Sequence, residues 1–103
     1  MEIKIDLKNA SSKEDVLQIL GEVLGYDETK SWGKNWDAFN DILRYLDKGG
    51  IWGTNEVFVF PVALLISNFQ TFKSQASNDF AILEDILNET KSANSEFDFK
   101  FVE

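Results

Sequence analysis

Residues 30–48 read KSWGKNWDAFNDILRYLDK and predict a loop that leads into a helix. Apolar side chains recur through this stretch at the three- and four-residue spacing of one helix face: Trp36, Phe39, Leu43 and Leu46. Asn35 stands where a side chain can cap the first turn, and the acid Asp37 suits the positive end of a helix dipole. We therefore predict a helix that begins after Asn35 and buries a single apolar stripe.

Two carboxylates on this helix, Asp37 and Asp41, are its candidate functional groups. At 100° per residue both lie roughly opposite the apolar stripe, and their four-residue spacing makes them neighbours on one exposed ridge. Like charges at this spacing cost about 0.2–0.5 kcal/mol in an isolated helix. A plain solvated face is the alternative, because Lys34, Arg44 and Lys48 fall on the same side and exposed pairs contribute only about 0–1 kcal/mol.

Length and charge restrict the class of protein and of partner. The chain has 103 residues, which predicts one domain spanning residues 1–103. Its hydrophobic content of 44% indicates a folded protein. The formal net charge of −8 disfavours nucleic acid and anionic membranes as partners. It favours a basic protein, which an acidic surface attracts over a long range.

The sequence contains neither cysteine nor histidine. Thiol catalysis, disulfides, Ser-His-Asp triads and nearly all zinc sites are therefore excluded. No apolar run reaches the length of a transmembrane helix, and the first residues, MEIKID, alternate in charge, unlike a signal peptide. We expect a cytoplasmic protein that needs no cofactor and no metal ion.

The segment before Lys30 predicts one strand and one helix. Apolar and charged residues alternate over 3–8, which is the pattern of a strand with one buried face. Residues 11–14 have the form of a capping box, and apolar residues at helical spacing follow over 16–24. Gly25 would end this helix in the left-handed conformation.

The segment after Lys48 predicts a turn, a strand, two helices and a last strand. Three glycines mark the turn over 49–53, and the unbroken apolar run 57–60 predicts the strand. Pro61 would end that strand or open a helix, whose apolar residues recur over 62–72.

The last helix and the last strand complete the chain. Asn78 or Asp79 would cap the helix, which points Leu83 and its periodic partners inward. Phenylalanines alternate with charged residues over 97–101 and predict the strand. The order is β-α-α-β-α-α-β, in which strands joined by helical crossovers should be parallel. The fold class is therefore α/β, a small three-stranded parallel sheet packed with helices.

The loop and the helix start resemble the barstar family of small intracellular ribonuclease inhibitors. That family carries an aromatic-Gly-x-Asn-aliphatic-Asp-Ala-hydrophobic segment, with a second Asp two residues further on. Residues 32–41 of this chain read WGKNWDAFND. Five positions match outright, and Trp36 and Phe39 match in character. The five are Gly33, Asn35, Asp37, Ala38 and Asp41.

The resemblance implies a barstar-like fold and an inhibitor that performs no reaction. Asp37 and Asp41 would form the centre of the inhibitory surface, and Gly33 and Asn35 would shape the loop before it. The partner would be a basic ribonuclease, either barnase-like or another nuclease toxin. The chain would act as its immunity protein, a monomer that forms a 1:1 complex by filling the active-site cleft.

Three further residues are candidate contacts, and each has an alternative. Residues 87–91, LNETK, are similar to a stretch in the family's last helix and point to Glu89 as a third contact acid. A solvated residue at a helix end is the alternative. Trp32 would either contact the partner or pack against the first helix. Trp52, in the 47–56 loop, would either supply an aromatic contact or join the core.

Three positions depart from the family pattern. Ser31 stands where many members carry an aromatic residue, and Asn40 stands where some do. Arg44 replaces a threonine of the family pattern. These partner-facing positions leave open whether the target is a barnase-type enzyme. They also motivate a second hypothesis, a module that kept the fold but changed its partner.

A third hypothesis is an enzyme in which Asp37 and Asp41 hold magnesium through water molecules. A pair on an exposed, convex ridge argues against it, because catalytic groups favour clefts.

Overall fold

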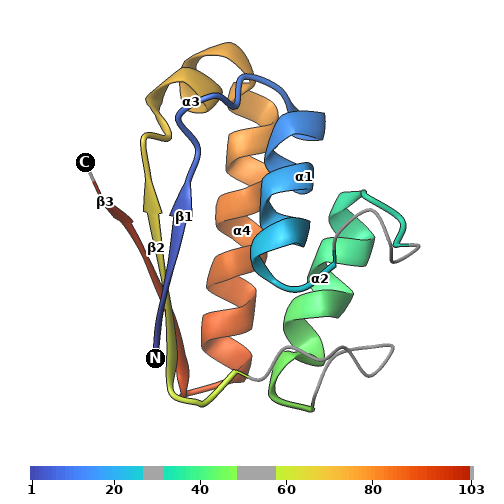
Figure 1. The fold of residues 1–103 in the computed structure, drawn as a ribbon, viewed down its shortest axis with the longest axis vertical. Helices are drawn as coiled ribbons and strands as arrows, with labels where there is room; N and C mark the ends of the chain where they lie inside the picture. Colours follow the sequence, from blue (N-terminus) through green and yellow to red (C-terminus); the bar gives the residue numbers. More distant parts are fainter. Residues whose placement is uncertain (27–31, 49–57, 103) are drawn as a thin grey trace.

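The computed structural model describes residues 1–26, 32–48 and 58–102 and has the predicted order of elements (Figure 1). These are β1 (Glu2–Asp6), α1 (Lys13–Val23), α2 (Trp36–Arg44), the 3-10 helix η1 (Leu46–Lys48), β2 (Val62–Ser67), α3 (Gln70–Gln75), α4 (Ser77–Ala93) and β3 (Phe97–Val102). The three strands are parallel and lie in the order β1-β2-β3. The predicted α/β class is confirmed.

One face of the sheet carries the helices. Ile5, Ile66 and Phe101 are paired across the three strands on that face. The helices α1 and α4 lie beside it in Figure 1, and α2 lies beyond them, farther from the sheet. Because α2 packs on α1 and α4, only its inner side is buried and its outer side faces solvent.

The central strand corrects our prediction for residues 57–72. Residues 58–61 form no regular element, Val57 lies outside the described residues, and the strand begins at Val62. Helical structure there is confined to the six residues of α3. The run VALLI is apolar at every position, so its spacing fits a helix as well as a strand. Pairing with neighbours on both edges decides in favour of the strand.

The helix starts also differ in part from the prediction. Ser12, one residue later than expected, caps α1 by accepting the backbone N–H of Asp15. The carboxylate of Asp15 in turn accepts the backbone N–H of Ser11 at 3.1 Å, and this bond is the main cause that lowers the pKa of Asp15. Helix α4 begins after Ala76 without a capping side chain, so the caps predicted at Asn78 or Asp79 are wrong. Gly25 has the expected left-handed φ of 89°.

Trp32 fixes the end of the loop that precedes α2. Its side chain is 7% exposed and lies against Gly21 of α1. A Cβ atom at Gly21 would stand 2.7 Å from Cζ2 of Trp32 and 2.9 Å from the carbonyl oxygen of Tyr26. The absence of a side chain at Gly21 therefore permits this close approach. Of the two alternatives for Trp32, the structure shows packing against the first helix.

We expect Gly21→Ala to lower the free energy of unfolding by about 1–3 kcal/mol, the usual cost of overpacking. At an exposed helix position the same change would stabilise by up to about 1 kcal/mol. Urea unfolding followed by circular dichroism measures the difference. Ser92→Ala, at an exposed position of α4, is the control and should not destabilise. A Gly21→Ala protein as stable as the parent would contradict the packing argument.

Candidate functional site

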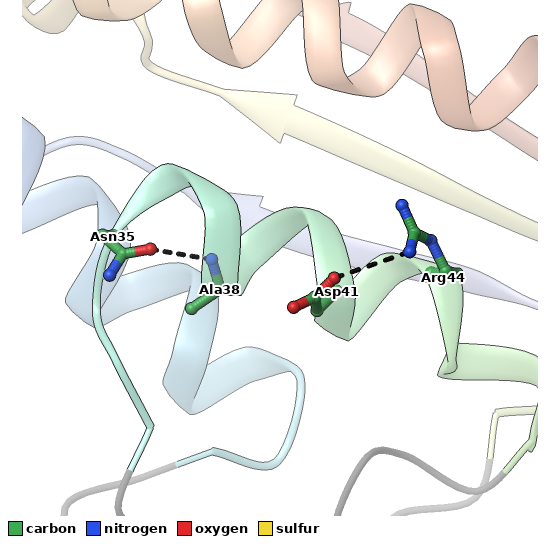
Figure 2. Close-up of polar contacts among 4 residues, drawn as sticks. All are labelled: Asn35, Ala38, Asp41 and Arg44. Atoms are coloured by element: carbon green, nitrogen blue, oxygen red, sulfur yellow. Dashed lines mark hydrogen bonds and ion pairs between the residues drawn. The ribbon is translucent and has the colours of Figure 1, made fainter.

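The residues Gly33, Lys34 and Asn35 determine where α2 begins. Oδ1 of Asn35 accepts the backbone N–H of Ala38 at 2.8 Å, which confirms the predicted cap (Figure 2). A Cβ atom at Gly33 would lie 3.0 Å from Nδ2 of Asn35 and 3.2 Å from Cβ of Ala38. Glycine therefore leaves room for the capping side chain. Lys34 takes the turn itself, in the left-handed region with φ of 48°.

Asp37 and Asp41 lie on the outer side of α2. Asp37 is exposed, and the side chain of Asp41 is 51% exposed. Figure 2 shows Asp41 beside Arg44, with 3.9 Å between Oδ1 and Nη1, at the outer limit of an ion pair. Such exposed pairs contribute about 0–1 kcal/mol and leave the carboxylate able to bind another group.

Lys34, Arg44 and Lys48 are the basic residues near these two aspartates, and their contacts differ. Nζ of Lys34 donates to Oε1 of Gln18 in α1 at 2.9 Å. Arg44 makes the long contact with Asp41. The side chain of Lys48 lies outside what the structure describes. Of the ion pairs that a plain solvated face would contain, the described side chains form only the weak Arg44–Asp41 pair.

A groove of about 490 Å³ separates the C-terminal parts of α2 and α4. It is lined by Asn40, Leu43, Arg44, Asp47, Glu89, Thr90, Ala93 and Asn94. Three residues predicted to bind the partner, Asn40, Arg44 and Glu89, are therefore brought to one place, although they come from two helices. The groove carries both signs of charge, because Arg44, Asp47 and Glu89 all line it.

Two predicted positions cannot be placed. Ser31 and Trp52 both lie outside the described residues, so their roles stay predictions. Trp32 lies in the core, and its Nε1 has no hydrogen-bond partner in the described part of the chain. Its role in binding the partner also stays a prediction.

Trp36 makes a contact that the sequence does not reveal. Its ring is half-buried and meets Phe39 edge to face, with 6.1 Å between ring centroids and 69° between planes. Its Nε1 donates to Oδ1 of Asp79 in the first turn of α4 at 3.0 Å. From the sequence one can expect only that a buried indole N–H finds an acceptor, and the sequence does not identify that acceptor.

The described residues contain no group of three or more acidic, cysteine or histidine side chains able to hold a metal ion. Over the same residues, no helix combines the length and the apolar character needed to cross a membrane.

Comparison of the sequence with known protein families assigns this chain to one of them. The family model described as Barstar (barnase inhibitor) matches residues 1–102. None of the curated proteins gives a significant match. Members of the matching family are inhibitors and not enzymes, which sets the magnesium-enzyme hypothesis aside. Because the match covers nearly the whole chain, this protein belongs to the barstar family, whose membership implies an inhibitor of a barnase-type ribonuclease.

Proposed function

We propose that the chain inhibits its ribonuclease by filling the basic active-site cleft with the outer side of α2. Asp37 and Asp41 supply the central carboxylates, and Glu89 adds a third from α4. Arg44 lies within this surface, beside Asp41, and Asn40, Gly33 and Asn35 would lie at its margin. The observation that carries the proposal is that Asp37 is exposed and the Asp41 side chain is 51% exposed, on a helix whose other side is in the core.

The charge of the two proteins favours this arrangement. A ribonuclease binds a polyanion and therefore collects cationic side chains around its cleft. A chain with net charge −8 is attracted to such a surface over a long range, which speeds encounter. Carboxylates on a packed helix are already oriented, so little conformational entropy is lost when they bind.

The same reasoning gives the context of the complex. We infer a cytoplasmic immunity protein that binds one ribonuclease toxin as a monomer, in a 1:1 complex and without a cofactor. The whole of residues 1–103 would act as one domain. Occlusion of the cleft needs no reaction, which agrees with the non-enzymatic character of the family.

A second candidate keeps the fold and changes the partner. Arg44 places a guanidinium 3.9 Å from Asp41, in the middle of the proposed acidic surface. Asn40 lines the groove where some family members carry an aromatic residue. The guanidinium favours a partner of mixed charge over a uniformly basic cleft, and the chain would then be an interaction module whose partner is not a ribonuclease.

We expect Asp37→Ala combined with Asp41→Ala to raise the inhibition constant for barnase at least about a thousandfold. Truncating one partner of a buried charge pair costs about 2–5 kcal/mol, and each 1.4 kcal/mol is tenfold in affinity. Ribonuclease assays with increasing inhibitor measure the constant, and circular dichroism checks the fold.

The matched control removes the same charge elsewhere. Glu2→Ala with Glu96→Ala changes two exposed acids, one in β1 and one just before β3, and should leave the inhibition constant nearly unchanged. Equal inhibition by the parent and the Asp37/Asp41 variant would remove the proposed surface.

Arg44→Ala should raise the rate of association with barnase, because it removes a positive charge from an acidic surface that faces a basic one. Arg44→Lys keeps the charge and should behave like the parent. Stopped-flow fluorescence at low and at high salt measures the rates, and the difference should shrink as salt screens the charges. Slower association or weaker binding of Arg44→Ala would instead indicate that Arg44 contacts an acidic group of the ribonuclease.

A further inference from the structure

One polar contact joins the start of α2 to the start of α4. The indole Nε1 of Trp36 donates to Oδ1 of Asp79 at 3.0 Å, across 43 residues of sequence. Both side chains are half-buried. A hydrogen bond between two half-buried groups is partly shielded from water, and it fixes the direction of one side chain relative to the other. It therefore holds the two helix starts at one relative position.

This contact acts on the rotation of α2. The other inward residues of the helix, Phe39, Ile42 and Leu43, are buried apolar side chains. Apolar burial is not directional and tolerates small rotations of a short helix. A hydrogen bond depends on the angle at the donor, so it does not tolerate such a rotation. Trp36 is the first residue of α2, immediately before Asp37, so a fixed indole also fixes the direction in which the following carboxylate leaves the helix.

We propose that Asp79 is a positioning residue for the inhibitory surface: it holds the Trp36 indole and thereby the orientation of Asp37 and Asp41. Its effect on ribonuclease binding rests on the proposed function. Asp79 need not touch the ribonuclease, because it acts through Trp36. The edge-to-face contact of Trp36 with Phe39 extends the constraint one turn further along α2.

Asp79 has a competing structural role that the test must separate. It is the acid in the first turn of α4, where a negative charge stabilises the helix dipole, and α4 has no capping side chain. Loss of that role would lower stability without altering the affinity of the folded protein. Asp79→Asn distinguishes the two, since an amide keeps a carbonyl oxygen for the indole N–H but has no charge.

The experiment compares Asp79→Ala, Asp79→Asn, Trp36→Phe and the Trp36→Phe/Asp79→Ala double variant, with barnase as the probe. Stopped-flow and calorimetric titration at 25 °C give the rate and dissociation constants, and urea unfolding gives the stability. We expect Asp79→Ala and Trp36→Phe each to raise the dissociation constant about tenfold, mainly through faster dissociation. The dissociation constant of Asp79→Asn should stay within about twofold of the parent value. That of the double variant should not exceed the larger of the two single-variant values, because both changes remove the same contact.

Two outcomes of the binding measurements would overturn the proposal. An Asp79→Ala protein that is less stable but binds like the parent would show a structural role alone. An Asp79→Asn protein that binds as poorly as Asp79→Ala would show that the charge acts directly and the indole contact does not matter.

A second readout in the free protein keeps this test separate from the proposed function. If the parent protein does not bind barnase, the proposed inhibition of barnase is wrong. The positioning role of Asp79 can still be measured in the free protein by ¹H–¹⁵N spectra. Backbone amide signals of residues 36–41 should then move in Asp79→Ala and Trp36→Phe but not in Asp79→Asn. Unchanged amide signals in Asp79→Ala would overturn the positioning role.

Discussion

The burial of one face of the sheet under α1 and α4 is the constraint on which the rest of the molecule depends. These helices pack on the outer strands β1 and β3, and α2 has to pack on the two helices. A helix in that second layer buries one narrow stripe and leaves the opposite side to solvent. The position of Asp37 and Asp41 at the surface is therefore a consequence of where the hydrophobic core ends.

The loop before α2 shows how small residues transmit this constraint. Gly21 admits the Trp32 ring to the surface of α1, and Gly33 leaves space for the capping side chain of Asn35. The first contact sets where the chain leaves α1, and the second sets where the next helix begins. Both glycines thereby help to determine which residues of α2 face outward.

The sequence predicted elements well where polar and apolar residues separate clearly. Alternation gave β1 and β3, and helical spacing with Asn35 gave α2. The run at 62–66 is apolar at every position, so local spacing could not distinguish a central strand from a helix. Pairing with two distant strands decided it, and that information is not local. The same limit applies to the site: the groove and the Trp36–Asp79 contact join residues more than forty positions apart.

Family membership and chemistry agree on the class of target but differ in detail. The loop, the cap and both aspartates fit an inhibitor of a basic ribonuclease. Arg44 and Asn40 give the groove between α2 and α4 a mixed character. A surface that combines both charges rejects partners whose charges do not match it, because an unmatched buried charge is costly. In the proposed complex, selectivity among ribonucleases would be determined in the groove, while Asp37 and Asp41 would supply the attraction.

The uncovered face of the sheet has a consequence for the molecule at high concentration. Lys4 and Lys100 flank Leu65 across the three strands, and both lysines are exposed. A second molecule laid face to face on this surface would place ammonium groups close to one another and would have to strip them of water. Charges of this kind on an open sheet oppose stacking and edge-to-edge growth. We therefore expect these two lysines to disfavour aggregation through this face of the sheet, while the opposite side of the molecule carries the groups proposed to recognise the ribonuclease.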